Sequence, residues 1–172
     1  MPATNELLQE GRYRIDQTVT GSDNVFEAYD TVRNTPVVVR EIPVKLNKVM
    51  TASQQESLKI AFTNQATALK DIRHESLLPV HDFFSEIDRQ YLVMEAVEGK
   101  DLASVLTANK RPFSVAEITR WADELLDALN YLHSQRPSIM HRNVRPQNLK
   151  LNNGKVKLFG VGLDSDIDSG DS

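Results

Sequence analysis

The sequence of 172 residues contains no cysteine. The chain can therefore form no disulfide framework, no thiolate nucleophile and no cysteine-ligated zinc cluster. Long apolar runs are absent as well: none approaches the roughly 20 residues that a membrane span needs, and the N-terminus has no signal-peptide core. We therefore expect a protein without a membrane partner, located in the cytoplasm.

An excess of positive charge is also missing. Twenty Lys and Arg stand against 24 Asp and Glu, which gives a formal charge of −4 and a pI of about 5.6. Such a balance provides no general basic field, so we expect no nucleic-acid partner. The 40% hydrophobic content is sufficient for the core of one globular domain.

Hydrophobic patterning predicts an α+β fold. Strands are expected at residues 13–19, 25–29, 36–42, 77–84 and 90–97, with a turn (TGSDN) between the first two. A short helical lead-in is expected at residues 5–10. Further helices are expected at about 53–72 and at 102–106, and the longest helix starts at about residue 114. The order of strands, one helix, two strands and then mainly helix is typical of an antiparallel sheet with a helix against it.

Two pairs of residues have the spacing of a helix capping box. Ser53 and Glu56 precede the first long helix, and Ser114 and Glu117 precede the second. The second helix then carries an apolar stripe at steps of three and four: Ile118, Ala122, Leu125, Leu129 and Leu132. Trp121 on this helix is expected in the core, and a partner-facing position is the alternative. His74, His81 and His133 lack a ligand-like spacing and are expected to be structural.

Five motifs occur in one order: GRYRI, VFEAYD, LVMEAVEGKDL, LLDALNYLHS and HRNVRPQN. Together they resemble a protein kinase domain, and more narrowly the serine/threonine kinases of bacterial type, from Gly11 to Leu163. The resemblance implies a kinase-like fold with an N-lobe of a five-stranded antiparallel sheet and one helix, followed by a partial helical C-lobe. The chain stops just after the position of the D-F-G motif.

The resemblance also implies a division of the chain. Residues 1–10 form a lead-in, residues 11–97 the N-lobe and hinge, and residues 98–163 the partial C-lobe. Residues 164–172 (DSDIDSGDS) are acidic, small and polar, which predicts disorder.

The phosphate-binding side of the implied nucleotide pocket departs from the family pattern. The loop before Val25 is short and has Gly21 as its only glycine, so an ordinary hairpin turn accounts for it. Val38 stands where alanine makes room for adenine, and Arg40 stands in place of the lysine that reaches the phosphates. Gln65 replaces its glutamate partner on the helix, so the activating ion pair is lost. Outside the family context, Arg40 would be a solvated charge at a strand end.

The catalytic and metal positions depart further. Asn143 replaces the catalytic aspartate and has no useful basicity near neutral pH. Arg145 replaces the loop lysine. Asn148 keeps the residue type that the family uses as a metal ligand, but loop-shaping hydrogen bonds are the expected role of both Asn143 and Asn148. Gly160 replaces the aspartate that holds Mg²⁺, and Lys150 replaces the apolar floor under adenine. Asp164 and Asp166 are the alternative source of carboxylates.

The architectural positions are kept. Leu69, Val80, His141 and Val161 correspond to the internal apolar column of the family. The gatekeeper is Met94, and Glu95 to Val97 form the hinge.

These substitutions predict a pseudokinase, a regulatory or protein-interaction module that has no functional catalytic residue, binds no metal and needs neither ATP nor magnesium. A slow, atypical phosphotransferase and a nucleotide sensor without catalysis are the alternatives. The expected partners are another protein, further domains of a longer parent chain, or a second copy that packs on the long-helix stripe from Leu125 to Leu132.

Overall fold

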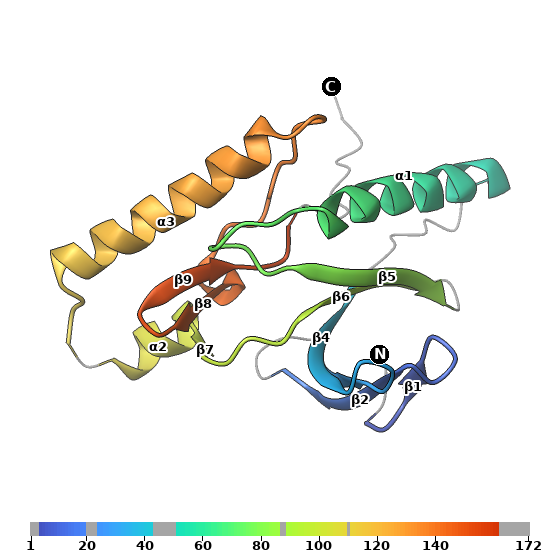
Figure 1. Ribbon diagram of the computed structural model, residues 1–172, viewed down its shortest axis with the longest axis horizontal. Helices are drawn as coiled ribbons and strands as arrows, with labels where there is room; N and C mark the ends of the chain where they lie inside the picture. Colours follow the sequence, from blue (N-terminus) through green and yellow to red (C-terminus); the bar gives the residue numbers. More distant parts are fainter. Residues whose placement is uncertain (1–3, 20–23, 43–50, 87–88, 110, 162–172) are drawn as a thin grey trace. The chain divides into compact units, whose positions relative to one another are not determined.

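The computed structural model describes residues 4–19, 24–42, 51–86, 89–109 and 111–161. The chain forms two compact units (Figure 1). The first consists of residues 1–71, 80–96 and 163–172, and the second of residues 72–79 and 97–162. The boundary within the expected hinge falls between Ala96 and Val97.

A six-stranded sheet forms the first unit. All neighbouring strands are antiparallel, in the order β1-β2-β3-β4-β6-β5. The strands are β1 (Leu7–Leu8), β2 (Tyr13–Thr18), β3 (Val25–Asp30), β4 (Thr35–Ile42), β5 (Val80–Glu86) and β6 (Arg89–Glu95). The five expected strands are confirmed within one to three residues at their ends.

One face of this sheet carries the core of the unit. In β2 the side chains alternate, with Tyr13 and Ile15 buried and Arg14 and Asp16 exposed, as a half-buried strand requires. The Phe84 ring stacks on Tyr13, with ring centroids 5.7 Å apart, and on Tyr91 at 5.0 Å. The other buried residues of this cluster are Leu8, Phe26, Ala28, Val37, Val39 and Val93.

The expected helical lead-in at residues 5–10 is wrong. These residues include the short strand β1, whose Leu7 and Leu8 pair with Arg14 and Tyr13 of β2. Gln9 and Glu10 have positive φ values of 49° and 56°, which are incompatible with a right-handed helix. The sheet therefore has six strands where the resemblance implied five.

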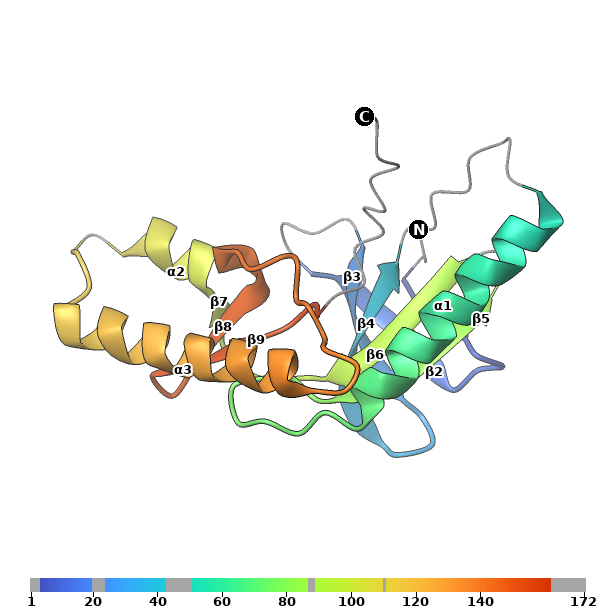
Figure 2. The same ribbon diagram turned by 90° about the horizontal axis from the view of Figure 1, so that it is seen from above.

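Helix α1 (Ala52–Lys70) lies along the β5–β6 side of the sheet (Figure 2). Its buried residues Phe62, Ala66 and Leu69 follow steps of four and three, and Phe62 meets Phe83 of β5 edge-on with centroids 6.1 Å apart. The helix begins at Ala52, so Ser53 lies inside the first turn and the cap predicted there is wrong. Propensity alone locates such boundaries only within a few residues.

The second unit contains a three-stranded antiparallel sheet and two α-helices. The strands β7 (Lys100–Asp101), β8 (Leu149–Asn152) and β9 (Lys155–Leu158) lie in that order. The helices are α2 (Leu102–Ala108), α3 (Val115–Ser134) and the short 3₁₀ helix η1 (Pro146–Asn148). The segment before β5 joins this unit, because Leu77 pairs with Leu158 of β9 in parallel.

The second predicted capping box is confirmed. The Ser114 hydroxyl accepts from the Glu117 N–H at 3.2 Å, and the Glu117 carboxylate accepts from the Ser114 N–H at 2.9 Å. The hydrogen bonds from Ser114 lower the pKa of the Glu117 carboxyl. Two of the N–H groups at the start of the helix, those of Ser114 and Glu117, thereby gain partners.

Helix α3 packs on the β8–β9 hairpin through one face. Ala128 and Leu132 are buried there, and the indole N–H of Trp121 donates to the Gly154 carbonyl at 3.0 Å. The Trp121 ring also meets the Phe113 ring edge-on, with centroids 4.9 Å apart. Because the Trp121 side chain is only half-buried, the core position expected for it is confirmed in part.

Three apolar side chains of α3 are exposed. Val115, Ile118 and Leu126 are 81%, 53% and 62% exposed. The stripe expected to need a cover, Leu125 to Leu132, is instead half-buried or buried within the unit. The prediction that this stripe stays open is therefore wrong, and the exposed apolar side chains of α3 are different ones. Among the described residues, no helix combines the length and apolarity needed to span a membrane.

Candidate functional site

Strands β3 and β4 carry the first group of candidate residues. Val25 pairs with Arg40, and Val38 pairs with Met94 of β6. Val38 is 8% exposed and Met94 is 1% exposed, so both belong to the apolar interior. Gly21 lies outside the described residues.

Arg40 is a buried cation. It is 4% exposed and lies in the ladder between Val25 and Leu92. The alternative interpretation, a solvated charge at a strand end, is therefore wrong. Gln65 lies in the C-terminal half of α1, and no carboxylate stands at its position. An ion pair between these two positions is excluded because the amide is neutral.

The linker after β6 is held by two side chains of β8. The Lys150 ammonium group donates to the Val97 carbonyl at 3.0 Å, and the Asn152 amide donates to the Glu98 carbonyl at 2.8 Å. Lys150 and Asn152 are two residues apart, so they project from the same face of the strand. Two linker carbonyls thus have donors from within the second unit.

Gly99 makes this approach sterically feasible. Its φ is +123°, a conformation that side chains with a β-carbon rarely adopt. A β-carbon at Gly99 would lie 2.2 Å from the Leu151 carbonyl oxygen. The linker can pass β8 this closely only because position 99 has no side chain.

The loop between α3 and β8 is shaped by its own hydrogen bonds. The Asn143 N–H donates to Nδ1 of His141 at 3.3 Å, which leaves Nε2 of this buried ring to donate to the Phe159 carbonyl at 3.2 Å. The Asn148 amide nitrogen donates to the Asn143 carbonyl at 2.8 Å. The Asn148 nitrogen therefore serves the loop, as the structural interpretation of this residue expected.

The remaining loop and metal positions offer little for metal chemistry. Arg145 is exposed and caps η1 with its backbone. Gly160 follows β9 with a φ of +82° and brings no ligand atom of its own beyond the backbone. Within the described ranges, no three His, Asp or Glu side chains gather where a metal ion could bind. Asp164 and Asp166 lie outside those ranges.

The retained column positions are all buried. In the first unit, Leu69 and Val80 are 1% and 6% exposed, and in the second, His141 and Val161 are 2% and 6% exposed. At the end of β6, Glu95 pairs with Val37 and is half-buried. His74 has a structural role, since its Nε2 lies 3.1 Å from the Asp127 carboxylate and its Nδ1 accepts from the Ser76 N–H.

Comparison with known families decides the relationship. The family model described as protein kinase domain matches residues 21–172. This chain belongs to the protein kinase family. The two-unit architecture and the order of the motifs agree with that assignment, and the α+β fold expected from the resemblance is confirmed.

Bacterial serine/threonine kinases are among the similar proteins. The chain is 27% identical over 165 residues to a probable serine/threonine-protein kinase, YbdM, of Bacillus subtilis, and 27% identical over 162 residues to the serine/threonine-protein kinase PrkC of the same organism. These matches cover 94% and 92% of this chain but 61% and 24% of the relatives. A probable kinase of Bifidobacterium longum, pknA2, is 31% identical over 164 residues. The chain thus spans less than two thirds of the length of these relatives.

Two features of this family member were not predicted from its sequence. The donation from Lys150 to Val97 joins residues 53 positions apart, and a chain of ion pairs in the first unit joins residues up to 70 positions apart. Neither has a local signature. A lysine at an otherwise apolar strand position was the signal for the first, but its acceptor could be identified only in the folded chain.

Proposed function

We propose that this chain is a kinase-like module that regulates or binds other proteins and does not transfer phosphate. The observation that carries the proposal is the 3.0 Å hydrogen bond from the Lys150 ammonium group to the Val97 carbonyl. In the protein kinase family, the hinge residues bind the adenine edge and position 150 provides an apolar floor. Here the floor position carries a cation whose charge is directed at the hinge backbone.

The energetic consequence is specific. Adenine binding would require the ammonium group to leave its acceptor, or to lie buried against an apolar ring. Burying an unpaired charge costs several kcal/mol in protein interiors. An adenine base offers no carboxylate that would neutralise this charge, so we expect Lys150 to oppose adenine binding.

The donor set for magnesium supports the same conclusion. Mg²⁺ in phosphotransfer sites is held by one or two carboxylates together with the phosphates. Gly160 supplies no carboxylate, and Asn148, whose nitrogen donates to the Asn143 carbonyl, offers only a neutral amide oxygen. The residues at these positions do not fit a magnesium-bound triphosphate, and we derive no phosphotransfer step through one.

The base and the activating ion pair are absent from their usual positions. Asn143 cannot accept the proton of an acceptor hydroxyl near neutral pH, and a positioned base typically contributes about 10²- to 10⁴-fold in rate. Arg40 has a neutral amide, Gln65, at the position of its expected partner. A protein that lacks both the catalytic base and the activating ion pair is what we expect of a kinase-like fold that serves in binding.

The alternative from the enzyme class is a slow, atypical phosphotransferase, which the similarity to proteins named as serine/threonine kinases favours. Labelled ATP with Mg²⁺ or Mn²⁺ and generic protein acceptors separates the two. We expect no incorporation above that of a heat-denatured sample. Incorporation that Arg40→Ala abolishes would contradict the proposal, with Arg14→Ala on the exposed face of β2 as the matched control.

The second alternative is a nucleotide sensor without catalysis. A thermal-shift titration with ATP, with and without Mg²⁺, tests it, because a ligand that binds only the folded state raises its stability. We expect no shift of the unfolding temperature. A saturable shift without phosphate incorporation would favour the sensor.

The proposed partner is a polypeptide rather than a small molecule. Val115, Ile118 and Leu126 on α3 form an exposed apolar face of the kind that marks protein interaction sites. The first arrangement to test is self-association of the chain through this face. Packing against another protein or against further parts of a longer chain is the other outcome.

A further inference from the structure

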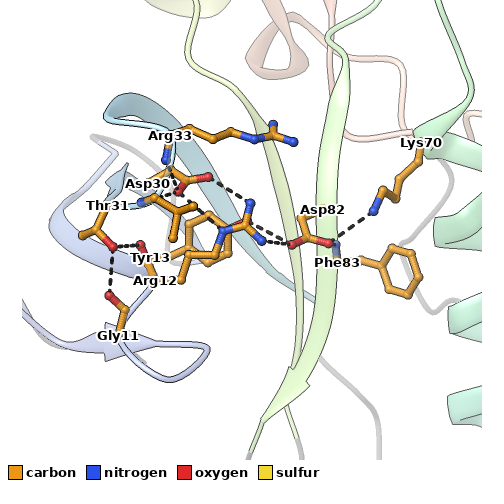
Figure 3. Close-up of polar contacts among 10 residues, drawn as sticks. Gly11, Arg12, Tyr13, Asp30, Thr31, Arg33, Lys70, Asp82 and Phe83 are labelled. Carbon is orange, nitrogen blue, oxygen red and sulfur yellow. Dashed lines mark hydrogen bonds and ion pairs between the residues drawn. The ribbon is translucent and has the colours of Figure 1, made fainter.

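Four charged side chains of the first unit form a continuous series of alternating sign (Figure 3). Asp30 at the end of β3 pairs with Arg12 at 3.2 Å, and Arg12 pairs with Asp82 of β5 at 2.9 Å. Asp82 then lies 3.4 Å from Lys70, the last residue of α1. We call these four residues the charge chain. Its formal charges cancel.

Asp82 is the central member. Besides its two cations, its carboxylate accepts from the Tyr13 hydroxyl at 3.0 Å and from the Phe83 N–H at 2.9 Å. Burial works against ionisation, but these hydrogen bonds and the charge of Lys70 outweigh it and lower the pKa of the Asp82 carboxyl. A carboxylate with this many donors is a fixed acceptor rather than a freely rotating surface charge.

The Asp30 end of the charge chain is anchored in the sheet. The Asp30 side chain is 1% exposed and accepts from the N–H groups of Val32 and Arg33, each at 3.0 Å. It therefore organises the turn between β3 and β4 while it orients Arg12. The position of Arg12 is in this way determined by the sheet and not by solvent.

The Lys70 end holds the helix. The Lys70 ammonium group lies 5.6 Å from the centre of the Phe83 ring, and Phe83 packs edge-on against Phe62 of the same helix. One residue pair of β5, Asp82 and Phe83, thus contacts α1 through both a charge and an aromatic ring. These contacts are confined to the C-terminal half of α1.

The ion pair that kinases form between β4 and this helix cannot exist here, because Gln65 is neutral. We propose that the charge chain sets the position of α1 on the sheet in place of that ion pair. Asp30 lies at the other end of β3 from Val25, the register partner of Arg40, whereas Asp82 and Phe83 are level with Val39 and Arg40 across β6. The position of the helix then depends on the charge of Lys70 and Asp82 and not on the charge of Arg40.

Hydrogen exchange of the α1 amides tests the proposal. The variant Lys70→Gln should accelerate exchange in α1 relative to β6 by roughly two- to fivefold, the range expected for a partly exposed ion pair. Lys70→Arg should restore the slow exchange. Arg14→Gln, which breaks the exposed pair with Asp16, is the matched control and should leave α1 unchanged.

Arg40→Gln distinguishes the charge chain from the family mechanism. We expect it to leave the ratio of α1 to β6 exchange unchanged. An unchanged ratio in Lys70→Gln, or a selective acceleration of α1 in Arg40→Gln, would overturn the proposal. Asp82→Asn should accelerate the exchange of the α1 amides more than Lys70→Gln does. In the Asp82→Asn background, Lys70→Gln should cause no further acceleration. If Asp82→Asn does not fold, the Lys70 variants still test whether the charge chain positions α1.

Discussion

The ammonium group of Lys150 and the carbonyl oxygen of Val97 lie 3.0 Å apart and connect strand β8 to the linker that follows β6. This contact assigns a cation to a position that the protein kinase family reserves for an apolar side chain. It also provides the linker carbonyl with an internal donor. The contact therefore ties the linker to β8 within the second unit, and under the proposed function it is also the contact that opposes a nucleotide.

Replacing Lys150 by methionine should make adenosine binding detectable. The variant removes the charge while it keeps a long apolar side chain, so the cost of burying an ammonium group against adenine disappears. At a ligand concentration of a hundred times Kd, binding adds about 2.7 kcal/mol to stability, which a thermal-shift titration resolves. Lys157→Met, at the register partner of Lys150 on β9, is the control and should remain without effect.

If Lys150→Met binds no adenosine, Lys150 is not the barrier, and the interpretation of its contact with Val97 is wrong. If wild-type protein already binds adenosine as well as the variant does, the barrier does not exist. Adenosine is the appropriate probe because it lacks phosphates. The result therefore does not depend on the metal positions.

Gly99→Ala should destabilise the protein severely. The new β-carbon would lie 2.2 Å from the Leu151 carbonyl oxygen at a φ of +123°, so both sterics and backbone strain oppose it. We expect a loss of about 3 kcal/mol or more in the free energy of unfolding, measured by urea titration. Gly154→Ala is the control: its φ is also positive, but its nearest neighbour is 3.5 Å away, and a loss of about 1 kcal/mol is expected.

Acid should destabilise the fold through Asp30 and Asp82. Burial opposes ionisation of both carboxyls, but hydrogen bonds from backbone N–H groups, with Arg12 at Asp30 and with Tyr13 and Lys70 at Asp82, lower both pKa values. Since the unfolded value is about 3.9, their contribution is present at neutral pH. It is lost as the pH falls from about 4 through the folded values.

Urea titrations between pH 7 and pH 3 measure this dependence. Arg12 remains cationic and Tyr13 remains neutral over the whole range, since both pKa values are raised, and the part of the slope that Glu117 contributes is the same in wild type and in the Asp30 variant. Asp30→Asn should flatten the curve below pH 4, whereas Asp16→Asn in an exposed pair should leave it unchanged. An equally steep curve in Asp30→Asn would count against this account.

Ser114→Ala should weaken the start of α3. The hydroxyl of Ser114 accepts from the Glu117 N–H, and loss of an N-cap typically costs about 1 kcal/mol. We expect this decrease in the free energy of unfolding from urea denaturation. Thr119→Ala, an exposed change within the same helix, should alter it by less than about 0.5 kcal/mol.

The exposed face of α3 predicts self-association that a single substitution can abolish. Ile118 and Leu126 are eight residues apart, so their side chains lie on one face of the helix. Light scattering should give a molar mass of twice 19.4 kDa for the chain and of one copy for Leu126→Glu. Ala116→Glu, which does not share this spacing, should leave the dimer intact. A monomeric wild type would contradict self-association through this face.

Much of the fold follows from local pattern. The alternation in β2 and the three- and four-residue steps of α1 and α3 specify strands and helices because each element needs one buried face. The Ser114 cap was predictable since its partner is three residues away. The cap predicted at Ser53 was wrong, because the position of a helix end also depends on contacts that residue spacing does not reveal. The lead-in became strand β1 because β2 offered an unpaired edge.

The sequence by itself determined the family, because residue types and their order are local information. Only the tertiary structure decided where Lys150 donates, that Arg40 is buried and that Arg12, Asp30, Asp82 and Lys70 form one series. These relationships join residues 12 to 70 positions apart. Their distances arise from strand register and helix packing, which exist only once the chain has folded.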